Sequence, residues 1–338
     1  MKLRSLVLTL VPIMAITAAC GGGAEKTKSA SGKELDKVTL TLNWYPYGEH
    51  APFYFGKKQG IFEKHGIDLQ IKAGQGSQKT VQATGAGQTD FGWADTPALL
   101  AGVSSGLPVK SIGVFMQTTP ASVQFFTDKG IKTPADLKGK NIAATAGDAP
   151  SRTFPAFLKK NGLSESDVHL QNTDPAGKMA AVISGKTDGL IGYANDQGPT
   201  MAAKSGKQVS VLKFADFGLN YYSNGLLVGD RKLKSDADLV KRMSAATSEA
   251  WAAAEKDPAN AVAAMQGASQ QLPSPTVLTD QFKTTLTLLH TAATKGKAPG
   301  VNTDADWQQT ISVFTQAGLI SKAQPPSAYW DSASAPQG

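Results

Sequence analysis

The stretch KVTLTLNWYPYGEHAPFYFGKKQGIFEKHGIDLQIKA, residues 37–73, decides the fold of this chain. Its first part, KVTLTLNW, alternates polar and apolar residues as a half-buried strand does. A helix candidate follows, with Pro52 near its first turn, and Gly66 separates it from the next strand, IDLQIKA. A strand, a helix and a second strand form a βαβ unit, which predicts a parallel sheet.

The loop before this helix concentrates aromatic residues, although the chain is only 7% aromatic. Pro46, Gly48 and Pro52 interrupt the region, so most of it cannot be a central strand or an ordinary core helix. We expect Trp44 and Tyr47 to face a ligand, because flat molecules stack on aromatic rings. The other rings are Tyr45, whose role stays open, and three expected in the scaffold, Phe53, Tyr54 and Phe55.

Strand and helix patterns continue to alternate up to Gly229, and the series restarts after Thr118. This alternation predicts an α/β fold with mostly parallel sheets and helices on both faces. From Ser235 onward the sequence is rich in alanine and predicts amphipathic helices packed on a finished scaffold. Trp251 and Trp307 fall at helical spacing in this part and are expected in the core.

Two segments share a shape, GQTDFGWAD at residues 87–95 and GKTDGLIGYAND at residues 185–196. Each turns on Gly-x-Thr-Asp, passes through a short buried strand and ends on an aromatic residue followed by acidic or amide groups. Ligands bind beyond the carboxyl ends of parallel strands, so two lobes facing one cleft are expected. The predicted lining residues are Trp93 and Asp95 on one wall, and Tyr193, Asn195 and Asp196 on the other.

Residues 1–19 are typical of a secretory signal peptide. Lys2 and Arg4 supply the positive start, and the apolar stretch at residues 6–19 is too short to span a bilayer comfortably. The export that this predicts fits a chain in which no internal disulfide is possible, since it contains 1 cysteine.

That cysteine, Cys20, follows TAA and precedes GGG, which resembles a bacterial lipobox, although Thr17 stands where leucine is usual. The resemblance implies a lipid on Cys20 that tethers the protein to a membrane. The alternative is a cleaved signal with an incidental cysteine. Residues 20–36 are rich in Gly, Ser and Lys and are predicted to form a flexible stalk.

The net charge of +7 falls to +5 without Lys2 and Arg4, and the remaining charges are spread out, which argues against nucleic-acid binding. The 4 histidines are scattered without metal-ligand spacing. Neither a P-loop nor a G-x-S-x-G elbow occurs. We therefore expect no metal, no cofactor and no catalytic residues.

Several motifs in order, LNWYPYGEH, GIFEKHGIDL, GQTDFG, GLPVK, IKTPADLKGKNIA and GKTDGLIG, resemble those of the NMT1/THI5-like substrate-binding proteins. That family includes binders of sulfonates, taurine and nitrate in ABC importers. The resemblance implies a periplasmic-binding-protein-like (type II) fold with two α/β lobes, two hinge crossings and a helical tail. The implied lobe boundaries are residues 37–122 with 223–332 for lobe 1, and residues 123–222 for lobe 2.

The resemblance also implies a function and partners. A ligand would close the lobes on each other, and the closed form would dock on an ABC permease that works with an ATPase. We expect a monomeric, exported protein, lipid-anchored to the outer face of the cytoplasmic membrane or located in the periplasm.

The family motifs indicate further candidates for ligand binding. Asn43 and His50 match the Asn and His of the family opening, where they could meet a heterocycle edge; alternatively, Asn43 holds the turn and His50 caps the helix. Two turns lead into helix N-termini, whose free N–H groups favour an anion or a carbonyl oxygen unless the residues are simply caps. Their residues are Gly76, Ser77 and Gln78 in the first lobe, and Asp148, Ser151 and Arg152 in the second.

The ligand class stays open. Relatives that bind the thiamine pyrimidine resemble YWNYE where this chain has YANDQ, so only Tyr193 and Asn195 carry over. Arg152 favours an anionic substituent, whereas three acidic groups favour a ligand with amine or N–H donors: Glu49, Asp95 and Asp196. We expect a small planar heterocyclic, aromatic or amine-bearing metabolite, with a sulfonate, taurine or nitrate as the alternative.

Fungal members of this family are enzymes that make the thiamine pyrimidine. They carry a Lys and a His after the D-x-G strand and a cysteine-rich CCCFC motif. Here Ala94 and Ala98 stand at the Lys and His positions, and Cys20 is the only cysteine. The chain therefore lacks the residues that this chemistry uses.

Overall fold

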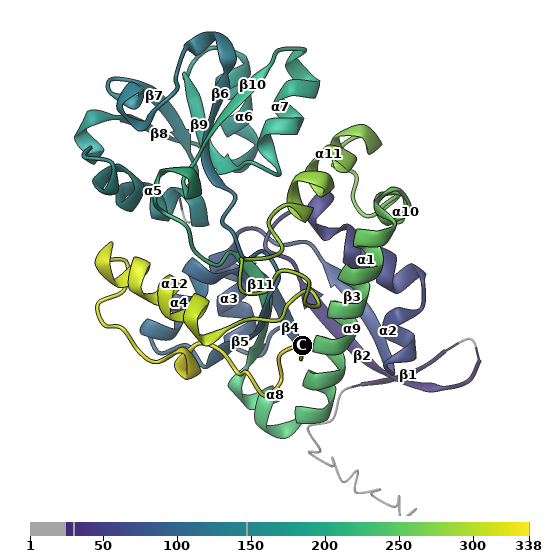
Figure 1. Ribbon diagram of the computed structural model, residues 1–338. Helices are drawn as coiled ribbons and strands as arrows, with labels where there is room; N and C mark the ends of the chain where they lie inside the picture. Colours follow the sequence, from purple (N-terminus) through teal and green to yellow (C-terminus); the bar gives the residue numbers. More distant parts are fainter. Residues whose placement is uncertain (1–24, 30, 147, 338) are drawn as a thin grey trace, which may run out of the picture.

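The computed structural model describes residues 25–337 except 30 and 147, and it has two α/β lobes, drawn one above the other in Figure 1. Each lobe is built on its own β-sheet. The predicted signal peptide and Cys20 lie outside the described residues. Within the described part of the chain, no helix is both long enough and apolar enough to cross a membrane.

The lower lobe contains a 6-stranded sheet with the order β1-β2-β4-β11-β5, in which β3 also pairs with β2. Its strands are β1 (Lys26–Lys28), β2 (Glu34–Thr41), β3 (Ile67–Lys72), β4 (Phe91–Asp95), β5 (Val109–Val114) and β11 (Asn224–Gly229). Strand β2 runs parallel to β3 and to β4, with Val38 opposite Leu69 and Leu40 opposite Phe91. The opening stretch thus forms the parallel βαβ unit that its pattern predicts.

The helix predicted inside this unit is divided into α1 (Ala51–Lys58) and α2 (Ile61–Lys64). Gly60 separates them with a φ of 71°, in the left-handed region that residues with a Cβ avoid. The chain therefore turns between the two helices before it enters β3.

The upper lobe contains a 5-stranded sheet with the order β10-β6-β9-β7-β8. Its strands are β6 (Ala121–Phe126), β7 (Asn141–Ala144), β8 (His169–Asn172), β9 (Gly189–Tyr193) and β10 (Val209–Lys213). Strand β7 is parallel to β8 and β9, whereas β6 is antiparallel to both β9 and β10.

Most strands of each sheet point the same way. Strand β11 is antiparallel to both of its neighbours, so β4 and β5 are parallel to each other, and β6 separates β9 from β10 in the same manner. The reversed strands β6 and β11 are the first strands after each crossing between lobes; β1 is the third reversed strand. The predicted α/β fold with mostly parallel sheets is confirmed.

The two crossings lie side by side. One joins β5 to β6 through residues 115–120, and the other precedes β11. The N–H of Ser223 donates to Met116 O at 2.8 Å, and the N–H of Thr119 donates to Asn220 Oδ1 at 3.2 Å. These bonds make one narrow connection from two segments that are far apart in sequence.

Helices cover the sheets, and the C-terminal helices pack mainly on the lower lobe, as the sequence predicts. The remaining helices are α3 (Ser77–Gly85), α4 (Thr96–Ser104), α5 (Ala149–Lys160), α6 (Pro175–Ile183), α7 (Gln197–Ser205), α8 (Asp230–Ser235), α9 (Ala237–Lys256), α10 (Pro258–Ala263), α11 (Pro275–Leu286) and α12 (Asp304–Gln316). Trp251 of α9 stacks on Trp93 with ring centroids 5.4 Å apart, and Phe53 meets Trp93 edge-on at 4.9 Å. Trp251 and Trp307 are both fully buried, which confirms their predicted place in the core.

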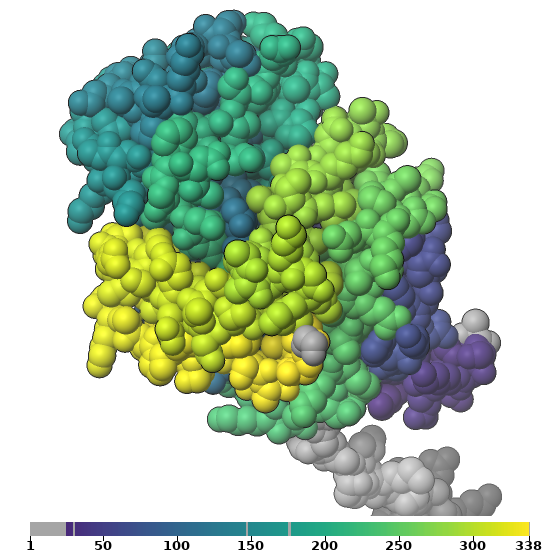
Figure 2. All heavy atoms as spheres, in the orientation of Figure 1, coloured from purple at the N-terminus to yellow at the C-terminus, as the bar shows by residue number. Residues whose placement is uncertain are grey.

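Helix α11 departs from this arrangement because it also reaches the upper lobe. It contacts α7 there, and in Figure 2 the light-green surface of this region lies against the teal upper lobe. It rests on the short 3-10 turn η1 (Gly48–His50). A Cβ on Gly48 would lie 2.5 Å from Leu278 O and 2.5 Å from Gln281 Cβ, which is too close for any larger residue.

The predicted flexible stalk is wrong for part of residues 20–36. Lys26–Lys28 form β1, antiparallel to the beginning of β2, with Lys26 opposite Asp36. Asp36 accepts from Lys26 Nζ at 2.6 Å and from Arg242 Nη2 at 2.8 Å. A chain with few apolar residues is ordered here because strand pairing and ion pairs replace hydrophobic burial.

Candidate functional site

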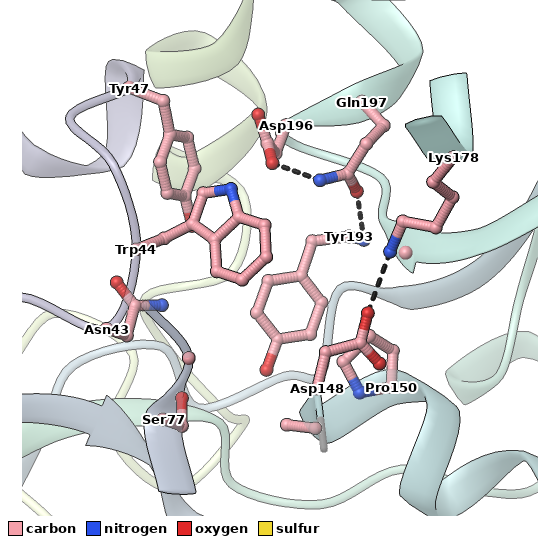
Figure 3. Close-up of a pocket in the computed structure, with 13 residues that line it drawn as sticks. Asn43, Trp44, Tyr47, Ser77, Asp148, Pro150, Lys178, Tyr193, Asp196 and Gln197 are labelled. Atoms are coloured by element: carbon pink, nitrogen blue, oxygen red, sulfur yellow. Dashed lines mark hydrogen bonds and ion pairs between the residues drawn. The ribbon is translucent and has the colours of Figure 1, made fainter. Parts of the chain in front are cut away.

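A small cavity lies between the lobes, beyond the carboxyl ends of β2 and β9 (Figure 3). Its lining comes from both lobes: Asn43, Trp44, Tyr47, Gly76, Ser77, Asp148, Ala149, Pro150, Lys178, Gly192, Tyr193, Asp196 and Gln197. Its volume is about 30 Å³, room for roughly two water molecules. A heterocycle therefore needs movement of the lobes or of lining side chains before it can enter.

The loop after β2 supplies the aromatic wall. Gly74 N–H donates to Trp44 O at 3.0 Å and Gly76 N–H donates to Asn43 O at 2.8 Å, so the loop is tied to the turn before α3. Trp44 lines the cavity and also two larger neighbouring grooves of about 260 and 710 Å³. Its indole thus stands between the inner cavity and the outside, while Tyr45 is 40% exposed.

His50 holds this loop from behind rather than facing a ligand. Its Nδ1 accepts from the N–H of Tyr47 at 3.3 Å, so Nε2 carries the proton of the neutral ring and donates to Asn43 Oδ1 at 2.8 Å. Burial lowers the pKa of His50 to about 3, which keeps the ring neutral at physiological pH. The side chain of His50 is fully buried with both nitrogens engaged, so it lies outside the cavity lining, and its contact with a ligand stays a prediction.

Glu49 is the centre of a buried hydrogen-bond network. Its carboxylate accepts from four neutral side-chain donors: the Tyr47 hydroxyl, Trp93 Nε1 at 2.6 Å, Asn224 Nδ2 at 2.6 Å and Asn195 Nδ2 at 3.3 Å. Burial raises the pKa of Glu49, against the effect of these donors. The same burial and the Glu49 charge hold the pKa of Tyr47 well above its usual range, so its hydroxyl stays a donor.

The upper lobe contributes a buried ion pair at the start of α5. Asp148 is the N-cap and accepts from the N–H of Ser151 at 2.8 Å, while Lys178 Nζ of α6 donates to its other oxygen at 2.7 Å. The side chains of Lys178 and Asp148 are only 2% and 9% exposed. Because each neutralises the other, this pair leaves no free positive charge among the described residues of the lining.

The end of β9 contributes Tyr193, Asp196 and Gln197. The Tyr193 hydroxyl is buried and finds no hydrogen-bond partner among the described residues. Gln197 donates to the Asp196 carboxyl and accepts from the N–H of Tyr193 at 2.8 Å. Desolvation raises the pKa of Asp196 to about 7, although the charge of Lys178 acts to lower it.

Three more of the predicted ligand residues lie outside the cavity lining, because tertiary packing takes their side chains away from it. Trp93 is enclosed by Phe53 and Trp251, and Asp95 is fully buried behind Ser77, whose Oγ accepts from the N–H of Asp95 at 3.1 Å. Asn195 is also fully buried and faces Glu49. Only two of the five residues predicted on the facing walls therefore line the cavity, Tyr193 and Asp196.

The two predicted turns differ in detail from expectation. Gly76 is the N-cap of α3, and both Gly76 and Ser77 line the cavity, whereas Gln78 lines the neighbouring groove. Helix α5 begins at Ala149, so Ser151 and Arg152 lie inside its first turn instead of before it. Neither of them belongs to the cavity lining. Arg152 Nη1 instead donates across the lobes to Gln78 Oε1 at 3.4 Å.

Several residues of the cavity and of the region behind it escaped the sequence prediction. Lys178 has a readable signal, since it is the one charged residue in the small and apolar stretch AGKMAAVISG. Gln197 stands where relatives that bind the thiamine pyrimidine carry an acidic residue, so the family pattern does not indicate it as a ligand residue. Gln281 and Thr285 come from the helical tail. Their partners Asp196 and Asn195 lie 85 and 90 positions earlier in the chain, so no local pattern connects them. Contact of the lining residues with a ligand stays a prediction.

Several known proteins are similar to this chain in sequence. The formylaminopyrimidine-binding protein of Halalkalibacterium halodurans is 24% identical over 227 residues, which cover 66% of each chain. The riboflavin-binding protein RibY of Chloroflexus aurantiacus is 28% identical over 256 residues, covering 72% of this chain and 71% of the relative. The 4-amino-5-hydroxymethyl-2-methylpyrimidine phosphate synthase of Uromyces fabae is 29% identical over 163 residues, covering 48% and 47%. The chain thus spans just under two thirds of the first relative and about half of the synthase.

A solved structure shows the same fold. The alkanesulfonate-binding protein SsuA from Xanthomonas axonopodis pv. citri, bound to MOPS, superposes with a TM-score of 0.66 at 19% identity, covering 87% of this chain and 98% of that one. The expected type II periplasmic-binding-protein fold is confirmed. The sequence model described as NMT1/THI5 like matches residues 48–261, more than half of the chain. This chain therefore belongs to the NMT1/THI5-like family.

Proposed function

We propose that this protein is the extracytoplasmic solute-binding component of an ABC importer, which captures a small molecule in the cleft and delivers it to a permease. The family membership supports this, as do relatives named as binding proteins. The two lobes with paired crossings support it too, because such a hinge lets a cleft open and close around a ligand.

The ligand that the cavity suits best is a small planar heterocycle or amine-bearing metabolite, similar to the thiamine pyrimidine. The observation that carries this choice is the ion pair of Lys178 with Asp148. The lysine of the lining is neutralised by this pair, so its charge is not available to an anionic ligand. Among the described lining residues the remaining carboxyl group is that of Asp196, which accepts from N–H donors when ionised. Trp44 and Tyr193 add aromatic surface for stacking, and the buried Tyr193 hydroxyl is available to a polar edge.

An organic sulfonate, taurine or nitrate is the second candidate, and one observation favours it. Helix α3 starts at the cavity with Gly76 as N-cap and no side-chain cap. Uncapped N–H groups at a helix N-terminus attract anions. Against this, the described residues that line the cavity include no arginine, and Asp148 already neutralises their lysine.

Catalysis is the third candidate, because one relative is named as a pyrimidine phosphate synthase. In this chain the two positions that carry Lys and His in such enzymes are Ala94 and Ala98, both buried. Alanine side chains can neither hold a proton nor form a covalent intermediate. This supports binding without turnover.

Thermal-shift measurements on the purified protein test the proposal. The panel comprises 4-amino-5-hydroxymethyl-2-methylpyrimidine, riboflavin, taurine, an alkanesulfonate and nitrate. A bound ligand at 100 times its Kd stabilises the protein by about 2.7 kcal/mol. We expect the aminopyrimidine to raise Tm, and Trp44→Ala to abolish the shift. The matched control is Tyr45→Ala, which removes the exposed neighbouring ring and should keep it.

A shift with sulfonate, taurine or nitrate and none with the aminopyrimidine would transfer the proposal to the anionic class. Formation of 4-amino-5-hydroxymethyl-2-methylpyrimidine phosphate by the protein, followed by mass spectrometry, would instead establish an enzyme. Absence of any shift across the panel would reject both ligand classes.

We also propose that Cys20 carries a lipid that anchors the protein outside the cytoplasmic membrane. The lipobox-like sequence around it supports this. Cys20→Ser should release the protein from the membrane fraction into the medium or periplasm. Membrane retention of this variant would refute the anchor.

A further inference from the structure

We propose that the two lobes close on each other without a ligand, held by a latch of buried hydrogen bonds between Asn195 in the upper lobe and Glu49 and Thr285 in the lower lobe. The side chain of Asn195 is fully buried. Its Nδ2 donates to Thr285 Oγ1 at 2.8 Å and to Glu49 Oε2 at 3.3 Å. Both of these donations cross from one lobe to the other.

The acceptors in the lower lobe are held in position independently of Asn195. Three lower-lobe donors already orient the Glu49 carboxylate, and the Thr285 hydroxyl donates to Gln281 O at 2.9 Å. The hydroxyl therefore presents its lone pairs to Asn195. Preorganised acceptors make the bonds to Asn195 less costly to form when the lobes meet.

A second set of bonds from α11 reinforces the latch. Gln281 Oε1 accepts from the N–H of Gly48 at 2.9 Å, which fixes the amide. Its Nε2 then donates to Asp196 O at 3.0 Å and to Thr200 Oγ1 at 3.3 Å, both in the upper lobe. The close backbone approach at Gly48 is what brings this amide within reach.

The latch residues stand behind the cavity rather than in it. The cavity lining contains none of Glu49, Asn195, Gln281 and Thr285. The closed arrangement leaves only about 30 Å³ between the lobes. Closure therefore needs no ligand contact, and a ligand enters only when the latch opens.

Because no latch residue lines the cavity, the latch can re-form behind a bound ligand once lining side chains have moved, and it then acts mainly on the rate of opening. Weakening it should speed both entry and release of a ligand while changing Kd little. Glu49 and Asn195 are thus positioning residues, since they act on the ligand through the lobe arrangement.

The test measures lobe separation in the ligand-free full chain and is independent of the proposed function. Spin labels are attached at Lys79→Cys and Lys186→Cys, exposed positions in the lower and upper lobe, with Cys20→Ser removing the only native cysteine. Pulsed dipolar spectroscopy then gives the distance distribution between labels. We expect one short, narrow distribution in the otherwise wild-type chain.

Asn195→Ala should add a longer distance, with the open population rising about tenfold or more for the two bonds lost. Thr285→Val removes one acceptor at similar volume and should change the population in the same direction by less. The matched control is Asn161→Ala, whose Nδ2 donates only within the upper lobe, to Phe157 O at 2.9 Å and Phe217 O at 3.3 Å.

A ligand-free chain that is already open would overturn the proposal. So would distributions of both latch variants that match the Asn161→Ala control. Because no ligand is added, either result is distinguishable from a failure to bind any member of the ligand panel.

Discussion

Replacing Asp196 by asparagine should change how the stability of the protein depends on pH. The Asp196 carboxyl is half-buried at the cavity and accepts from Gln281 Nε2 at 3.2 Å and from Gln197. Desolvation raises its pKa to about 7, against about 3.9 in an unfolded chain. Between these values the folded protein binds a proton that the unfolded chain has lost, so this carboxyl lowers stability as pH rises.

The size of the effect follows from proton linkage. With a folded pKa of about 7, ionisation of Asp196 costs about 1.5 kcal/mol at pH 5 and about 4.2 kcal/mol at pH 8. The difference, about 2.6 kcal/mol, is an upper bound because the side chain keeps some contact with solvent. As the pH rises from 5 to 8, the free energy of unfolding of Asp196→Asn should increase by about 1–2 kcal/mol relative to that of the wild type.

Urea unfolding at pH 5, 6, 7 and 8 measures this difference. The NH2 group of the asparagine cannot accept from one of the two glutamine donors, which costs about 1 kcal/mol at every pH. The readout is therefore the change of the free energy of unfolding with pH, and not its difference from the wild type at one pH. His50 contributes a term of opposite sign, because its lowered pKa costs stability as pH falls. That term occurs in both proteins and cancels.

The matched control is Asp280→Asn, which neutralises an exposed carboxylate on α11. Its stability should follow the wild type at all four pH values. Parallel curves for Asp196→Asn and wild type would refute the reasoning, because they would mean that Asp196 ionises as in the unfolded chain.

Two further predictions test the packing around the site. Lys178→Met should lower the free energy of unfolding by about 3–5 kcal/mol, because it leaves Asp148 buried without a counter-charge. The control Lys79→Met, at an exposed position, should change the free energy of unfolding little. An equal loss in both variants would count against the ion pair. Trp93→Phe should cost about 1–3 kcal/mol through the lost bond to Glu49. It should leave the Kd for the aminopyrimidine within about 3-fold, whereas a tenfold loss measured by calorimetry would place Trp93 in the ligand site.

The element order of the fold could be predicted from local patterns, since period-2 and helical segments alternate along the chain. The opening stretch predicted the first βαβ unit, and β2, β3 and β4 are parallel as expected. Two local features escaped prediction, the break at Gly60 and strand β1. The strand depends on ion pairs with Asp36, which a composition rich in Gly, Ser and Lys does not reveal.

The sequence predicted where the cavity lies but not all of the residues that line it. Ends of β-strands and starts of helices were correct places to look, and Trp44, Tyr47 and Tyr193 do line the cavity. The pattern could not separate rings that face the cleft from rings that face the core. Trp93 follows the same strand-end rule as Tyr193, yet it packs on Trp251 from a helix far along the chain.

The sequence by itself determined the class of fold, the presence of two similar half-structures and the aromatic loop, because these follow from short-range periodicity and turn residues. Only the tertiary structure decided which polar groups meet. Glu49 has its four donors because a loop, two strands and the far lobe converge on it, and Asn195 becomes a latch because α11 returns beside it. Such partners are set by long-range packing of buried groups that must satisfy one another's hydrogen bonds, which no local pattern records.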